Sequence, residues 1–135
     1  MKRTIVIKNQ QQELARVTEF VEEVCEDLEI DMRTMMKIQL AMEETVSNVI
    51  LYAYPAESRE DITIMAESDE KMLAFVITDR GEPFDPTVNE KADTETNPMD
   101  REQGGMGIFI VKNIMDEVSY CRIDNTNRLT MKKKL

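Results

Sequence analysis

Three of the four glycines in this chain lie within four positions, at Gly104, Gly105 and Gly107, directly before an apolar run. In that run, residues 108–115, apolar side chains recur at helical spacing, so the glycines are predicted to mark a helix N-terminus. The first N–H groups of a helix lack partners within it and attract anions, and glycine lets a ligand touch the backbone. The segment 103–107 therefore predicts either a phosphate-binding turn or a tight turn that packs a helix closely on a sheet.

Several other chemistries are excluded by what the sequence lacks. There is no Gly-Lys-Ser/Thr for a P-loop, and no Rossmann-type glycine spacing follows a strand. The chain contains no histidine, which removes Ser-His-Asp and Cys-His catalysis, most metal sites and a phospho-accepting histidine. Any catalysis must use carboxylates, Lys, Arg, amides and backbone groups.

Length and charge limit the class of protein and its partners. The 135 residues are predicted to form one domain, residues 1–135, with a core of its own. The net charge of -10 argues against nucleic acid or an anionic membrane as a partner and suits a partner with a basic face. No apolar run reaches the length of a membrane span. Cys25 and Cys121 are far apart without a CxxC pair, so a reducing, cytoplasmic setting is expected.

The first half of the chain predicts one strand and two helices. Residues 4–8 are a short run rich in β-branched side chains, which is typical of a strand. Residues 13–29 carry an apolar helical stripe opposite an acidic face. That face is interpreted as solvated or as a docking surface for a basic partner. A second helix is predicted from about Met32 to Tyr54, N-capped by Asp31 and ended by Pro55.

Two polar residues interrupt the apolar second helix. Glu44 and Asn48 are four positions apart and share one face. A carboxylate and an amide on a buried helix need partners or a cavity. One interpretation is a satisfied core pair or a partly exposed edge. The other is a polar floor under a ligand, with the Asn48 oxygen suited to Mg²⁺ and Glu44 suited to act as a base.

Residues 61–66 and 72–78 are predicted to form a strand pair, and the second strand runs directly into Asp79. An unpaired carboxylate at the end of a buried strand is costly, but it could accept the exocyclic amine of adenine, whereas guanine would present an oxygen. Gly81 would keep the next backbone free of a side chain. An ordinary turn after a strand has the same pattern.

The rest of the chain predicts a long loop and a hairpin. Residues 86–103 show no periodicity, and a loop of this length in a compact domain is usually a lid, a binding loop or a disordered segment. Because it joins the aspartate turn to the glycine turn, a lid that closes over a nucleotide is favoured. After the glycine helix, residues 118–123 and 129–133 are predicted to form a hairpin across the turn 124–127.

These three local signals occur in one order along the chain, and together they resemble the ATP-binding motifs of the GHKL (Bergerat-fold) superfamily. The resemblance covers about residues 4–133 and is closest to the anti-sigma factor serine-protein kinase branch of the histidine-kinase-like ATPase domains. The residues that carry it are Glu44 and Asn48, then Asp79, Gly81 and Phe84, then Gly104-Gly105-Met106-Gly107.

This resemblance implies a fold and a ligand. The fold would be an α/β two-layer sandwich, with helices packed on one face of a mixed, mostly antiparallel sheet. ATP with Mg²⁺ would lie between the two long helices and the lid of about 86–103.

The resemblance also implies residue roles. Glu44 would be the catalytic base that takes a proton from the attacking hydroxyl, and Asn48 would hold Mg²⁺ against the phosphates. Asp79 would read adenine beside Gly81. The remaining motif residues would complete the nucleotide site, with N–H groups of the glycine turn meeting the phosphates: Phe84, Gly104, Gly105, Met106 and Gly107.

In this branch the substrate is a serine of a STAS-type anti-anti-sigma protein, the kinase can also sequester a sigma factor, and a homodimer is consistent with the family. Phosphoryl transfer needs positioning, a metal and a base, none of which requires histidine.

The alternatives are a non-catalytic binding module gated by ATP and a domain that binds no nucleotide. The chain departs from the branch in having Tyr52-Ala53-Tyr54 where His-Gly/Ala-Tyr is frequent, and Gln103 in place of arginine, with Arg101 two residues earlier.

Overall fold

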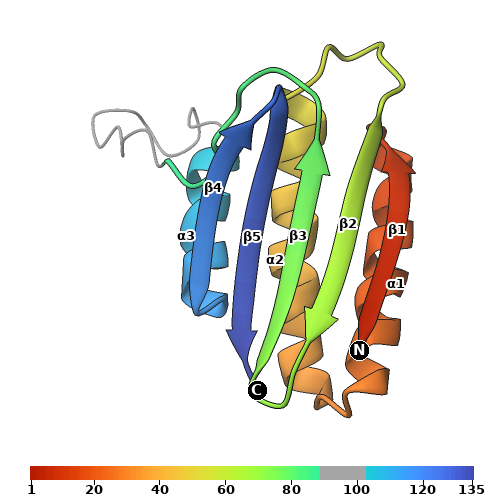
Figure 1. Ribbon diagram of the computed structural model, residues 1–135, viewed down its shortest axis with the longest axis vertical. Helices are drawn as coiled ribbons and strands as arrows, with labels where there is room; N and C mark the ends of the chain where they lie inside the picture. The colour runs from red at the N-terminus through yellow and green to blue at the C-terminus, as the bar shows by residue number, and fades with distance from the viewer. Residues whose placement is uncertain (89–102) are drawn as a thin grey trace.

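The computed structural model describes residues 1–88 and 103–135, and only the backbone of Gln103–Met106. The described elements form two layers, a sheet with the strand order β1-β2-β3-β5-β4 and helices behind one of its faces (Figure 1). In chain order they are β1 (Lys2–Lys8), a 3-10 turn (Gln11–Glu13), α1 (Leu14–Asp27), α2 (Met32–Tyr52), β2 (Asp61–Ser68), β3 (Met72–Asp79), α3 (Gln103–Ile114), β4 (Glu117–Ile123) and β5 (Thr126–Lys134).

The predicted two-layer sandwich with helices on one face is confirmed, but the described strand pairings are all antiparallel rather than mixed. The connections explain this. The pairs β2–β3 and β4–β5 are joined by short turns, which only antiparallel neighbours can use. Between β1 and β2 the chain runs through two successive helices, α1 and α2, and returns beside its starting strand in the opposite direction.

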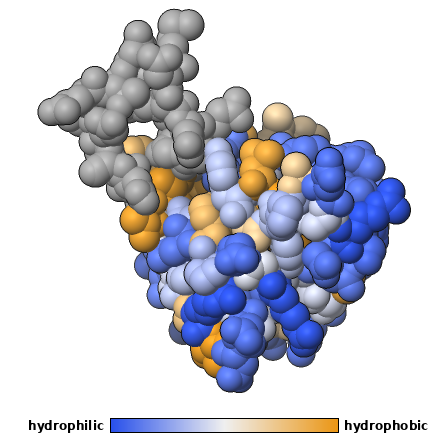
Figure 2. All heavy atoms as spheres, turned by 90° about the horizontal axis from the view of Figure 1, so that it is seen from above, coloured by the Kyte–Doolittle hydropathy of each residue, from blue (hydrophilic) through white to orange (hydrophobic). Residues whose placement is uncertain are grey.

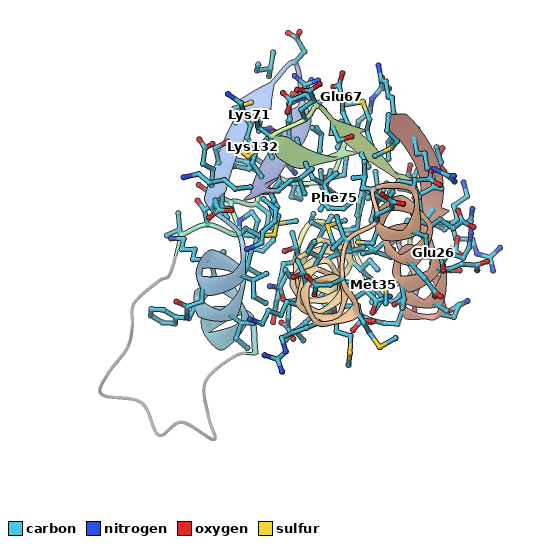
Figure 3. All side chains as sticks on the ribbon, turned by 90° about the horizontal axis from the view of Figure 1, so that it is seen from below. Glu26, Met35, Glu67, Lys71, Phe75 and Lys132 are labelled. Carbon is cyan, nitrogen blue, oxygen red and sulfur yellow. The ribbon has the colours of Figure 1, made fainter. Side chains whose placement is uncertain are left out.

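The core lies between the sheet and the helices. Alternate side chains of the strands point inward, and Phe75 of β3 lies in the middle of this layer (Figure 3). No described helix covers the opposite face of the sheet. Side chains along each strand therefore alternate between the buried core and this open face, as in other antiparallel sheets that are covered on one side. In the described ranges no helix is both long enough and apolar enough to cross a bilayer. Fully buried inward side chains include Val17, Val21, Met42, Val46, Ile62, Ile64, Leu73, Phe75 and Met131.

The second helix begins as predicted. The side chain of Asp31 accepts a hydrogen bond from the backbone N–H of Thr34 at 2.8 Å, which satisfies one of the free donors of the first turn of α2. The helix ends at Tyr52, two residues before the predicted end.

The C-terminal hairpin differs from the prediction. Its loop consists of Asp124 and Asn125, whose φ angles of 51° and 60° are left-handed. Asp and Asn tolerate this conformation, so two residues suffice to reverse the chain. As a result β5 begins at Thr126, and Asn127, which the sequence had suggested for the turn, lies in the strand and is buried.

The end of α2 is joined to the end of β3 by backbone contacts. The carbonyl of Ala53 accepts the N–H of Glu82 at 2.7 Å, and the hydroxyl of Tyr54 accepts the N–H of Arg80 at 2.9 Å. A Cβ added to Gly81 would lie less than 3.0 Å from the carbonyl oxygen of Ala53. Since no glycine in the described part of the chain has a positive φ, Gly81 is required here by close packing rather than by an unusual backbone angle.

Gly81→Ala is therefore expected to lower the free energy of unfolding by about 1–3 kcal/mol, because a backbone carbonyl cannot move aside as a flexible side chain can. Urea unfolding of the purified protein measures this. The matched control is Glu82→Ala, whose side chain is exposed and whose N–H is retained, with an expected change within about 0.5 kcal/mol. Equal stability of the two variants would contradict the role of this contact.

Candidate functional site

The predicted motif residues meet at one end of the molecule. The C-terminal half of α2, the end of β3 and the first turn of α3 lie at the same end of the two layers, the upper end in Figure 1. Figure 2 views this end, where some apolar surface is visible. The structure thus brings together signals that are up to 63 positions apart, from Glu44 to Gly107.

Glu44 and Gly107 touch. A Cβ added to Gly107 would lie less than 3.0 Å from the carboxylate oxygen Oε2 of Glu44, so a larger residue at this position would displace the Glu44 carboxylate. Gly107 is buried, whereas Glu44 is half-buried and keeps access to solvent. The Glu44 carboxylate thus lies next to the second turn of α3.

The glycine turn opens α3 as predicted, because the helix begins at Gln103. Gly104 and Gly105 therefore fall in the first turn, where backbone N–H groups have no acceptor within the helix. Such N–H groups and the positive end of the helix dipole attract an anion. Gly107 lies further inside α3, and its contact with Glu44 is a second reason for a glycine that the sequence did not reveal.

Asn48 lies one turn after Glu44 on α2 and is 7% exposed. Its side-chain amide has no hydrogen-bond partner among the residues that the structure describes. A buried amide without a partner is costly, so this group is suited to a ligand. No three His, Cys, Asp or Glu side chains in the described ranges could together hold a metal ion. A single amide oxygen fits Mg²⁺, which usually keeps water and takes phosphate oxygens as its other ligands.

Asp79, the last residue of β3, is 4% exposed. Its Oδ1 accepts the N–H of Gly81 at 2.8 Å and the side-chain amide of Asn127 at 3.0 Å. Its Oδ2 has no hydrogen-bond partner within the described ranges. Burial raises the pKa of the Asp79 carboxyl, although the hydrogen bonds from Asn127 and Gly81 and the nearby charge of Arg122 act in the opposite direction. The result is a buried carboxylate with one oxygen free to accept a hydrogen bond.

Asn127, which donates to the Asp79 carboxylate, is the residue of the candidate site that the sequence did not predict, because Asp124-Asn125-Thr126-Asn127 is typical of a turn. It is 3% exposed and lies directly opposite Asp79 in the β3–β5 register. The sequence did contain one signal, the position of Asn127 in the alternation of β5. Asn127 continues the inward alternation of Leu129 and Met131.

Phe84 packs on Tyr52 of α2, with ring centroids 5.5 Å apart. Tyr52 is one of the positions at which the chain differs from the branch that it resembles, and the Phe84 ring is its packing partner here. The Nζ of Lys112 donates to the carbonyl of Thr87 at 2.9 Å and ties α3 to the segment after Phe84. Most of the predicted lid of 86–103, and Arg101 with it, lies outside the described residues, as do the side chains of Gln103 and Met106.

Solved structures share this fold. The RsbU and RsbW domains of a Mycobacterium tuberculosis protein match 100% of this chain and 32% of that chain, with a TM-score of 0.71 and 14% identity. A histidine kinase domain from Erythrobacter litoralis matches 93% of this chain and 60% of that chain, with a TM-score of 0.57 and 12% identity. At these identities the likeness concerns the fold.

Sequence relatives carry regulatory names. A serine-protein kinase RsbW from Staphylococcus aureus is 30% identical over 89 residues, 60% of this chain and 54% of that protein. An anti-sigma F factor from Halalkalibacterium halodurans is 29% identical over 111 residues, 82% of this chain and 75% of that protein. The matched part of the chain thus spans about half the length of the RsbW relatives.

A family model described as a histidine kinase-like ATPase domain matches residues 7–133. This range includes α2 with Glu44 and Asn48, the end of β3 with Asp79, and all of α3. The chain belongs to the histidine kinase-like ATPase domain family.

Proposed function

We propose that this chain is an ATP-dependent serine-protein kinase and anti-sigma factor, which transfers the γ-phosphate of ATP to a serine of a STAS-type anti-anti-sigma protein. The observation that carries the proposal is the contact of the Glu44 carboxylate with Gly107, in the second turn of α3. It puts a base one helical turn from the first-turn N–H groups that favour a phosphate. The names of the RsbW and anti-sigma F relatives support the regulatory role.

On the adenine side, Asp79 would select the base. Its free oxygen can accept a hydrogen bond from the 6-amino group of adenine, whereas the 6-oxo group of guanine would face it as a second acceptor. Removing a partner from a buried polar group costs more than the bond itself contributes, so this contact discriminates as well as binds.

On the phosphate side, the first-turn N–H groups of α3 and the Asn48 amide oxygen would hold the triphosphate. Mg²⁺, when bound at Asn48, would neutralise charge on the phosphates. The chain itself supplies orientation, because Asn48 and Glu44 lie on adjacent turns of one helix.

In the transfer step, the serine Oγ of the partner would form a bond to the γ-phosphorus while the bond to the bridging oxygen of ADP breaks. Glu44 would take the proton that the serine loses. Glu44 is half-buried, so a serine side chain from a docked partner can approach it from solvent.

The setting of the protein is also part of the proposal. We place it in the cytoplasm, which suits the two free cysteines, Cys25 and Cys121. A homodimer and the capture of a sigma factor stay predictions from the family. A non-catalytic ATP-gated binding module is the alternative, favoured by Gln103 at the position where the branch often has arginine.

Nucleotide binding is expected to need Mg²⁺ and Asn48. Titration calorimetry with a non-hydrolysable ATP analogue should show binding that weakens when Mg²⁺ is removed. In Asn48→Ala this dependence on Mg²⁺ should disappear, because the amide ligand is gone. An absence of binding at millimolar analogue would reject both the kinase and the ATP-gated module.

Glu44→Gln should keep analogue binding but lower transfer of phosphate to a STAS-domain protein by about 10²–10⁴-fold, since the amide cannot accept the proton. Transfer of radioactive phosphate from ATP measures this. Glu43→Gln is the matched control, because Glu43 faces Thr18 of α1 instead, and it should transfer normally. If Glu44→Gln regulated its partner as well as the wild type, the non-catalytic alternative would hold.

Asp79→Asn should weaken ATP binding by about tenfold or more, because an amide N–H would face the adenine amine. The same change should raise the melting temperature at neutral pH. The pKa of Asp79 is raised in the folded protein, so its charged form costs stability above that pKa, and the cost disappears as the pH falls toward the ordinary value of 3.8. The difference between variant and wild type should therefore shrink on acidification. In Asp124→Asn, an exposed control, neither property should change.

A further inference from the structure

Asn127 uses its whole hydrogen-bonding capacity inside the protein. The two hydrogens of its Nδ2 go to Oδ1 of Asp79, at 3.0 Å, and to the carbonyl of Glu82, at 2.8 Å. Its Oδ1 accepts from the guanidinium of Arg122, at 2.9 Å, and from the hydroxyl of Tyr120. A primary amide offers two donors and two acceptor positions, and all four are occupied.

These partners permit only one orientation of the amide. The Arg122 guanidinium can only donate, so the amide oxygen must face it. The carboxylate of Asp79 and the carbonyl of Glu82 accept, so the nitrogen must face them. A flipped Asn127 would set donor against donor and acceptor against acceptor in a site that is 3% exposed.

The orientation of Asn127 determines that of Asp79. One carboxylate oxygen, Oδ1, is held by two donors, Asn127 and the N–H of Gly81. The other oxygen is left without a partner among the described residues. Arg122 makes no ion pair with Asp79 in the described part of the chain and instead donates to the carbonyl of Gly81 at 3.0 Å. The carboxylate is thus held by neutral donors, which leave its second oxygen a stronger acceptor than an ion pair would.

We propose that Asn127 is the positioning residue for adenine recognition, held in turn by Tyr120 and Arg122 of β4. It turns Asp79 so that Oδ2 accepts the 6-amino group of the base. This inference rests on the proposed ATP binding and deepens it, because it assigns base specificity to a hairpin that carries none of the three motifs.

Asn127 could also serve only to satisfy buried polar groups. A purely structural Asn127 would affect stability, and affinity for all purine nucleotides alike. A positioning residue affects the preference for a base that carries the 6-amino group. The two roles are separated by comparing ATP with purine riboside triphosphate, which differs from ATP only in lacking that amine.

The experiment measures the affinities of the full chain for both nucleotides with Mg²⁺ by calorimetry. The wild type should prefer ATP by about tenfold or more, as expected of a charge-assisted hydrogen bond. Asn127→Asp has the same shape but cannot donate to Asp79, and its preference should fall to within about twofold. The matched control, Asn125→Asp, makes the same change in the exposed turn and should keep the wild-type ratio.

A folded Asn127→Asp protein that keeps the wild-type ratio would overturn the proposal, as would a wild type that binds both nucleotides equally. If Asn127→Asp does not fold, Tyr120→Phe decides, because it removes one donor to Asn127 from a partly exposed position. The preference of this variant for ATP over purine riboside triphosphate should be about threefold smaller than that of the wild type, and an unchanged preference would overturn the inference. A wild type that binds neither nucleotide would instead contradict the proposed function itself.

Discussion

The contact between the carbonyl of Ala53 and the backbone at Gly81 sets the geometry on which the rest of the site depends. It joins the helix that carries Glu44 and Asn48 to the strand end that carries Asp79, with no side chain between them. Backbone-to-backbone contact leaves little freedom, because neither partner can adopt another rotamer. The two halves of the site are therefore held at one distance by the packing of the fold, before any ligand is present.

The site keeps polar groups that the rest of the core does not tolerate. Asp79 has one buried oxygen without a partner, and the amide of Asn48 is buried without one, among the residues described. Each lowers the stability of the folded chain, and a ligand that pairs with them would offset that cost. Such local conflict with good packing is typical of functional sites, where stability is given up for binding.

Sequence reasoning succeeded where a local rule decides the structure. The cap at Asp31, the helical periodicity of α2 and the glycine turn before α3 each depend on neighbours within a few residues, and the structure has all three. The predicted turn of residues 124–127 was too long, because two left-handed residues, Asp124 and Asn125, complete the loop. Asn127 therefore lies in β5. The close contacts of Gly81 with Ala53 and of Gly107 with Glu44 join distant parts of the chain, so no local pattern could reveal them.

The pairing of Asp79 with Asn127 across β3 and β5 has a consequence for how the protein folds. A strand that slips by one residue turns all of its side chains to the opposite face. In a β5 slipped by one residue, Asn127 would point to the open face of the sheet, and Thr126 or Arg128 would take its place beside Asp79. On the proposed role of Asn127, nucleotide choice would then be lost in a molecule whose motifs are all intact. The proposed role of Asn127 therefore makes accurate alignment of β5 during folding a condition for ligand recognition.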